Sequence, residues 1–214
     1  MIKKNLFTYD DATHRGYIDG IPIPSVTQLL KPLEDWDVVP EHILGPARDK
    51  GHYRHKMIEL YLHGELAETA LEQDDKDCLE QFKKFETEHG LRRDDAIIEY
   101  QMVSQRGNPF FGTPDIIIDE SSIKAIIDIK CGVYGEWRHK YIFPLQLAGY
   151  ERLWRLNGGS PGKYEHYCLY LYPDNYRFLF CKNKQASQTF GYLLKNWYIK
   201  RDYEKKIEQW KNQK

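Results

Sequence analysis

Two apolar runs near the middle of the chain lack the alternation of a strand with one wet face. Residues 116–118 and 125–127 are apolar at consecutive positions, which is typical of strands covered on both faces of a sheet. Asp128 and Lys130 stand at the end of the second run. A charge in such a place is costly unless a cation or a dense set of hydrogen bonds compensates it. The rest of the chain must therefore supply a partner for these charges.

Helical spacing and stop signals predict helices before and after these strands. Apolar residues recur at helical spacing over 47–63, where Gly64 ends the pattern, and a more charged helical segment ends at Gly90. Glycine is typical just after a helix because it adopts the left-handed conformation easily. The predicted helices cover residues 47–63, 74–89, 145–157 and 183–214.

Turn signals at 107–109 and 120–122 divide the central segment into three strands of an antiparallel meander. Near the start, residues 13–24 predict a short hairpin or an extended arm, and Ser25 suits the N-cap of a short helix over 26–30. We assign no site residue to this segment. The predicted strands cover residues 96–104, 110–118, 123–130, 164–172 and 176–181.

This order of elements predicts an α/β (α+β) fold in which a mixed central sheet is flanked by helices. A chain of 214 residues suits one domain with a sizeable core. We divide it into an N-terminal arm over 1–44, a core over 45–182 and a C-terminal helix over 183–214.

Charge is unevenly distributed along the chain. Residues 131–214 carry 15 Lys+Arg against 7 Asp+Glu, whereas residues 1–130 carry 16 against 25. An acidic half that gathers a metal and a basic half that holds a polyanion would suit a metal-dependent enzyme acting on phosphodiesters. No window approaches the ~18 apolar residues of a membrane span, and the start lacks a signal-peptide pattern. We expect a cytoplasmic protein with no membrane partner.

The cysteines are widely spaced, and no C-x-x-C pair occurs. Neither a zinc ribbon nor a disulfide framework is indicated, so free thiols are expected. The cysteines are Cys78, Cys131, Cys168 and Cys181.

The end of the third central strand is the candidate site. Asp128 and Lys130 are two residues apart, so their side chains leave the strand on the same face. Asp115 precedes Asp128 by 13 residues, and the short turn between them lets the two carboxylates meet across an antiparallel pair. Carboxylate oxygens are the ligands that Mg²⁺ and Mn²⁺ prefer. Lys130 would then orient or deprotonate a water, or neutralise charge on a phosphate.

Pro114-Asp115 followed by Asp128-Ile129-Lys130 resembles the PD-(D/E)xK signature of the restriction-endonuclease-like nucleases. Two further motifs resemble those of the RecB-like exonuclease branch, which includes the mitochondrial genome maintenance exonucleases and their phage relatives. They are G-x-x-x-H, at Gly51 to His55, and Q-x-x-x-Y, at Gln146 to Tyr150. The resemblance covers roughly residues 45–172, and the agreement in order and spacing makes the set far more specific than any one motif.

The resemblance implies a Mg²⁺- or Mn²⁺-dependent DNA exonuclease. In that family pattern His55, Asp115, Asp128 and the backbone carbonyl of Ile129 would bind metal, and Glu99 would support the site. The catalytic set would be Asp115, Asp128, Lys130, Gln146 and Tyr150. The expected partner is DNA with a free end, in phage or mobile-element recombination, replication or repair, with a recombination or single-strand-binding protein as a further candidate partner.

Other interpretations remain open from the sequence. The same core could be a flap or junction endonuclease, or a silent nuclease fold that binds DNA or protein. Asp128 and Lys130 could form a structural ion pair, and Gln146 and Tyr150 could cap a core face. His55 could be a half-buried helix histidine, whereas His52 and Glu59 suit the surface.

Two further classes of site are not expected. The cysteine spacing does not match the group that holds an iron–sulfur cluster in helicase-linked relatives, and no P-loop occurs. In the last helix the aromatic residues could stack on unpaired bases while basic residues follow the backbone, or they could pack against the core. These aromatics are Trp197, Tyr198, Tyr203 and Trp210.

Overall fold

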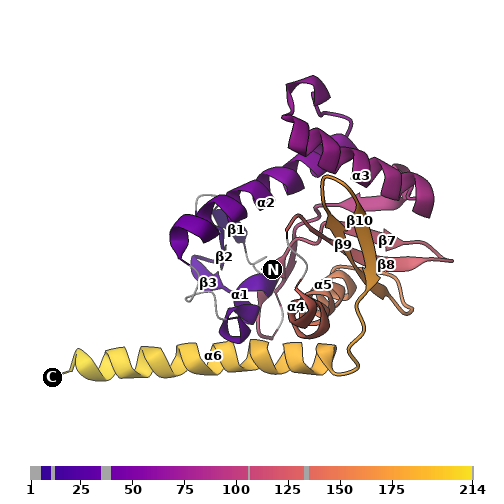
Figure 1. Ribbon diagram of the computed structural model, residues 1–214. Helices are drawn as coiled ribbons and strands as arrows, with labels where there is room; N and C mark the ends of the chain where they lie inside the picture. Colours follow the sequence, from indigo (N-terminus) through magenta and orange to yellow (C-terminus); the bar gives the residue numbers. More distant parts are fainter. Residues whose placement is uncertain (1–5, 11–12, 35–39, 106, 133–134, 214) are drawn as a thin grey trace.

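A five-stranded mixed sheet forms the centre of the protein (Figure 1). The computed structural model describes residues 6–10, 13–34, 40–105, 107–132 and 135–213. Strands β8 and β9 are parallel, and the other neighbours are antiparallel. In sheet order the strands are β10 (Tyr176–Phe180), β9 (Glu165–Leu171), β8 (Lys124–Lys130), β7 (Ile116–Asp119) and β4 (Ala96–Ile98).

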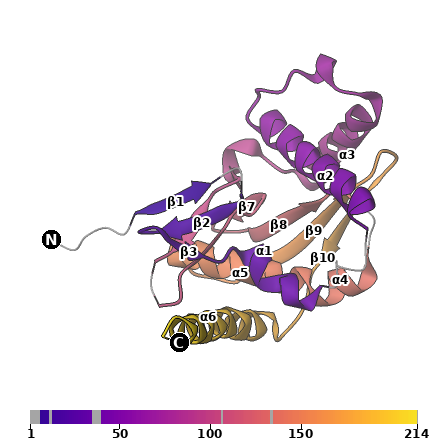
Figure 2. The same cartoon turned by 90° about the vertical axis from the view of Figure 1, so that its left-hand side faces the viewer.

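Helices cover both faces of this sheet (Figures 1 and 2). One face packs against α2 (Glu41–Leu62) and α3 (Gln73–His89), and the other against α5 (Phe143–Leu156) and α6 (Ala186–Lys211). Along β8 the side chains alternate between the two layers, because Ile126 lies in the α5 layer and Ile127 in the α2 and α3 layer. This architecture confirms the mixed α/β fold expected from the sequence. A short helix, α4 (Glu136–Tyr141), precedes α5, and 3₁₀ turns occur at Lys31–Leu33, Glu68–Ala70 and Arg93–Asp95.

The antiparallel pairing predicted for the three central strands is confirmed, but the first two predicted strands are each interrupted. The expected strand over 96–104 divides at Glu99, whose φ of 46° is unfavourable for an extended residue. Its partner over 110–118 divides at Thr113 and Pro114, where proline supplies no ladder donor. The outer halves, β5 (Met102–Ser104) and β6 (Phe110–Gly112), form a separate two-stranded sheet. The register continues across the break, since Ile98 pairs with Ile116 and Met102 with Gly112.

The N-terminal segment forms a small antiparallel sheet, so the hairpin is confirmed and the extended arm is not. It comprises β1 (Phe7–Asp10), β2 (Arg15–Ile18) and β3 (Ile21–Ile23). Ser25 caps α1 (Val26–Leu30) as predicted, because its hydroxyl accepts from the Gln28 amide while the Gln28 side chain accepts from the Ser25 amide.

Helix α6 changes character along its length. Its first half packs tightly on α5: a Cβ at Gly149 would lie 2.6 Å from the Phe190 ring. Trp197 and Tyr198 contact the same core layer, whereas Tyr203 and Trp210 are more than half exposed on the part of the helix that extends beyond the body (Figure 1). None of the described helices is long and apolar enough to cross a membrane.

Candidate metal centre

Three acidic residues lie at one level across three neighbouring strands. The β4–β7 register, extended by one residue, places Glu99 opposite Asp115, and the Glu99 amide donates to the Asp115 carbonyl at 3.0 Å. The β7–β8 register, extended in the same way, places Asp115 opposite Asp128. The backbone therefore sets a row of carboxylates across the sheet, and we call Glu99, Asp115 and Asp128 the carboxylate row.

Asp115 is the centre of this row. It is only 7% exposed, and its side chain accepts from the Ile129 amide. His55 reaches it from α2, with Nδ1 3.1 Å from the Asp115 Oδ1. Burial alone would raise the pKa of Asp115, but the charge and hydrogen bond of His55, together with the Ile129 amide, hold it below its usual value. For His55, burial lowers the pKa and Asp115 more than compensates, so the net pKa is raised.

Helix α2 is fixed in place by the residue next to His55. Arg54 is 5% exposed, and its Nε donates to Asp75 Oδ1 at 2.8 Å. A second guanidinium nitrogen donates to Asp74 Oδ2 at 2.6 Å. These contacts tie α2 to α3 and hold the adjacent His55 over the carboxylate row.

Asp128 is bound by the remaining predicted residues. Its Oδ2 pairs with the Lys130 ammonium, and its Oδ1 accepts from Gln146 Nε2 at 3.0 Å. Gln146 also accepts from Lys130 at 3.2 Å, and its Nε2 lies 3.0 Å from the Tyr150 hydroxyl. Gln146 and Tyr150 share a helix face, as their spacing of four predicts. The motif side chains thus form two contact groups on adjacent strands: His55 contacts Asp115, and Asp128 contacts Lys130 and Gln146. Asp128, a predicted metal ligand, is not in the potential ligand group of His55, Glu99 and Asp115.

Burial and neighbouring charges both shift the pKa values of Asp128, Lys130 and Tyr150. Burial raises the pKa of Asp128, and the charge of Asp115 adds to the shift, although Lys130 opposes it. Burial would lower the pKa of Lys130, but the carboxylate of Asp128 raises it overall, so the lysine stays charged. Burial keeps the Tyr150 pKa well above its usual value, so this hydroxyl stays protonated.

His55, Glu99 and Asp115 form a group of potential metal-binding side chains. One ligand atom from each lies within 4.8 Å of the others. Two carboxylates and an imidazole suit Mg²⁺ or Mn²⁺ when the remaining positions hold water. The sequence pattern gave Glu99 only a supporting role, because nothing local shows that its strand breaks there. The proposed contribution of the Ile129 carbonyl stays a prediction, whereas its amide binds Asp115.

The pKa of Glu99 is strongly raised. Burial raises its pKa to about 9, and the charge of Asp115 and a hydrogen bond to it add to the shift. At neutral pH the group is therefore a carboxylic acid that donates to the Asp115 carboxylate. A divalent cation bound beside Glu99 would favour loss of this proton, because its positive charge stabilises the carboxylate. Glu99 could then bind the cation together with His55 and Asp115.

Glu99→Gln is expected to stabilise the metal-free protein at pH 8 but hardly at all at pH 5. The folded protein binds the Glu99 proton more tightly than the unfolded chain does, so this group lowers the free energy of unfolding as pH rises from about 4.5 toward about 9. Glutamine carries no such cost, and we expect a gain on the order of 1 kcal/mol or more at pH 8. Urea unfolding at both pH values measures it. The exposed Glu65→Gln serves as control, and an equal gain at both pH values would contradict the assignment.

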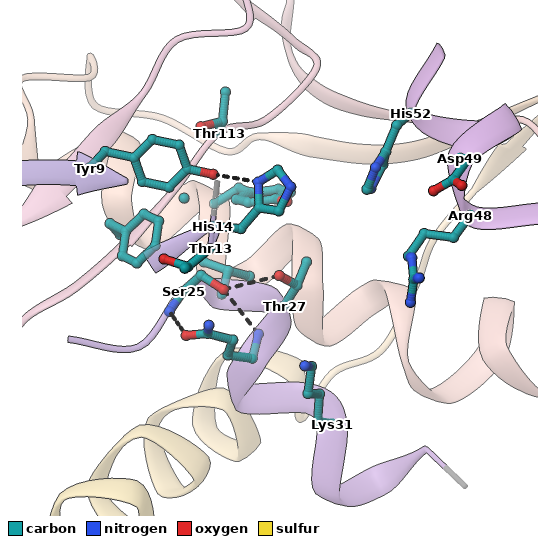
Figure 3. Close-up of a pocket in the computed structure, with 15 residues that line it drawn as sticks. Tyr9, Thr13, His14, Ser25, Thr27, Lys31, Arg48, Asp49, His52 and Thr113 are labelled. Carbon is teal, nitrogen blue, oxygen red and sulfur yellow. Dashed lines mark hydrogen bonds between the residues drawn. The ribbon is translucent and has the colours of Figure 1, made fainter. Parts of the chain in front are cut away.

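A cavity of ≈ 620 Å³ adjoins this centre at Tyr150 (Figure 3). His14 and Lys31 come from the N-terminal segment, whereas Arg48 and His52 come from α2. The His14 ring is held by the Tyr9 hydroxyl, 3.0 Å from its Nδ1. The polar lining includes Tyr9, His14, Lys31, Arg48, His52 and Thr113.

Two permanent cations, Lys31 and Arg48, line the cavity together with one acid, Asp49. Burial lowers the pKa of His52, and the charges of His14, His55 and Arg48 lower it further, against the weaker effect of Asp49. His52 is exposed, as its sequence suggests, but it faces this cavity. Sequence reasoning missed His14 and Lys31, because no local pattern connects the N-terminal sheet with the carboxylate row.

No family model and no curated protein sequence matches the chain. Among solved structures, the chain is similar to one described as the crystal structure of SSO0001, with a TM-score of 0.39 and 16% sequence identity. The similarity covers 56% of this chain and 59% of that chain, so it spans little more than half of that protein. A similarity of this size carries no argument about function, which has to come from the site.

Proposed function

We propose that this protein is a divalent-metal-dependent deoxyribonuclease with a restriction-endonuclease-like fold, and that it hydrolyses DNA from a free end. The observation that carries the proposal is the carboxylate row across β4, β7 and β8, with His55 on one side and Lys130 on the other. The three acids of this row outnumber the two bases that pair with them, His55 and Lys130, and burial keeps Glu99 protonated. Such an arrangement favours a bound cation.

Mg²⁺ or Mn²⁺ would be held by His55, Glu99 and Asp115, with Asp128 as the neighbouring carboxylate. When bound, the ion would polarise a phosphodiester and lower the pKa of a water. Lys130 lies beside Asp128 and stays charged, so it can orient the attacking water or stabilise charge developing on phosphate. Gln146 links the two residues, because its side-chain oxygen accepts from Lys130 and its Nε2 donates to Asp128.

The cavity next to Tyr150 supports a polyanionic substrate. Its cationic lining can accept the phosphates of a strand whose scissile bond lies at the carboxylate row. Tyr9 and His14 offer ring faces at the same wall, which suits contact with unpaired bases.

The test compares a linear DNA with a covalently closed single-stranded circle of the same sequence, both with Mg²⁺. We expect mononucleotides or short oligonucleotides from the linear substrate and an intact circle. Equal cleavage of both would reject end dependence and favour the flap or junction endonuclease, with the same metal centre. No cleavage of either by metal-loaded protein would favour a silent DNA- or protein-binding module.

A further inference from the structure

A second group of potential metal-binding residues lies in the α5 layer, next to the carboxylate row, because Cys168 is the β8–β9 register partner of Asp128. Cys168 is on β9, Cys181 follows β10 and His139 is on α4. The two sulfur atoms are 3.3 Å apart, and Cys181 Sγ lies 4.0 Å from His139 Nε2. One ligand atom from each of the three lies within 4.8 Å of the others. Both cysteines are at most 4% exposed.

We propose that His139, Cys168 and Cys181 form a zinc site that fastens α4 to β9 and to the segment after β10. Tetrahedral zinc with Zn–S of about 2.3 Å and Zn–N of about 2.0 to 2.1 Å separates its ligand atoms by about 3.5 to 3.8 Å. The sulfur atoms and the imidazole are already close to this spacing. Thiolate and imidazole are soft and borderline ligands, which favour Zn²⁺ over the Mg²⁺ or Mn²⁺ expected at the carboxylate row.

The surroundings of the group also suit zinc. The His139 ring lies beside Cys181, whose Sγ is 3.7 Å from Nδ1 and 4.0 Å from Nε2, and Nδ1 also lies 3.2 Å from the Tyr170 hydroxyl. Two thiolates neutralise Zn²⁺, so the loaded site would carry no net charge in this buried layer. Water or the Tyr170 hydroxyl can complete the fourth position.

Strand register argues against a disulfide between the same cysteines. In the β9–β10 pair, Cys168 lies opposite Leu179, so Cys181 is two residues further along on the diagonal. Diagonal neighbours in an antiparallel pair have Cα atoms roughly 7 to 8 Å apart. A disulfide usually requires Cα atoms closer than about 6.8 Å. Zinc can bridge the diagonal without moving either strand.

The other two cysteines provide a matched control. Cys78 and Cys131 hydrogen-bond to one another in the opposite layer, where the charge of Arg54 acts on Cys78. The structure also places no histidine in a candidate ligand group with them among its described residues.

Cobalt titration of the chelator-treated, reduced protein tests the site. We expect one equivalent of Co²⁺ to produce thiolate-to-metal charge-transfer absorption and the strong visible bands of tetrahedral cobalt, and Zn²⁺ to displace it. Cys168→Ser and Cys181→Ser should lose the charge-transfer band, whereas the Cys78→Ser/Cys131→Ser double variant should keep it. His139→Ala, which leaves both thiols and removes a half-buried ring, should weaken binding by at least ~10-fold.

The readout is independent of nuclease activity, because cobalt at the carboxylate row would produce no thiolate band. Absence of the band in the wild-type protein would overturn the zinc site. The same conclusion would follow if the band survived in Cys181→Ser or disappeared in the Cys78→Ser/Cys131→Ser variant. An intact mass lower by two hydrogens, with a disulfide mapped to Cys168 and Cys181, would replace the metal site with a redox pair.

Discussion

Asp115→Asn and Asp128→Asn are each expected to lower DNA turnover by about 100-fold or more, the scale of losing a group that supports a catalytic metal. Asparagine keeps the size of the side chain, and its oxygen can still accept from the Ile129 amide or from Gln146. The fold should therefore persist. Removing one charge relieves repulsion within the carboxylate row but also breaks the ion pair with His55 or Lys130, so the free energy of unfolding is measured alongside turnover.

Asp119→Asn is the matched control for these variants. Asp119 ends β7, where it pairs with Lys124 at 2.7 Å and accepts from the Trp154 indole and the Ser160 amide, each at 2.9 Å. Its loss should cost about 1 to 3 kcal/mol of stability and leave the turnover of the folded enzyme unchanged. Single-turnover cleavage and urea unfolding of all three variants separate the two effects. Near-normal turnover in a folded, metal-loaded Asp115→Asn protein would be incompatible with the proposed centre.

Lys130→Ala is expected to reduce turnover by about 100-fold or more while metal binding is kept. The ammonium contacts Asp128 and Gln146 and lies 4.3 Å from the centre of the Phe143 ring. In the proposed centre, its loss would remove the positive charge expected beside the phosphate without removing a proposed metal ligand. Isothermal titration with Mn²⁺ and single-turnover cleavage measure the two properties separately.

Lys124→Ala provides the comparison on the same strand. Lys124 also pairs with an aspartate, but at the opposite end of β8 from the carboxylate row. Stability should fall, and turnover by the folded fraction should stay near that of the wild type. If Lys130→Ala and Lys124→Ala behaved alike, the Asp128–Lys130 pair would be structural, as one interpretation of the sequence allows.

Sequence patterns were sufficient where a local rule decides side-chain direction. The two-residue spacing of Asp128 and Lys130 on a strand, and the four-residue spacing of Gln146 and Tyr150 on a helix, each specify one face. Buried apolar runs identified β7 and β8, and their short turn fixed the register that sets Asp115 opposite Asp128. The N-cap of α1 followed from Ser25 for the same reason, since its partners lie within three residues.

Features that depend on contacts between distant segments could not be predicted from sequence patterns. The left-handed conformation of Glu99 interrupts a segment that otherwise suits one strand, and tertiary contacts with Asp115 determine it. The cationic cavity combines the N-terminal sheet with α2, and the thiol–imidazole group combines α4 with β9 and the segment after β10. Each depends on packing between segments that have no common periodicity.

Metal removal and restoration test the central claim most directly. Protein freed of metal by a chelator is incubated with uniformly labelled linear DNA, and release of acid-soluble label is followed after addition of Mg²⁺, Mn²⁺ or Ca²⁺. We expect no release in excess chelator, restoration by Mg²⁺ or Mn²⁺, and binding without efficient turnover with Ca²⁺. Undiminished cleavage in excess chelator would contradict a metal-dependent nuclease.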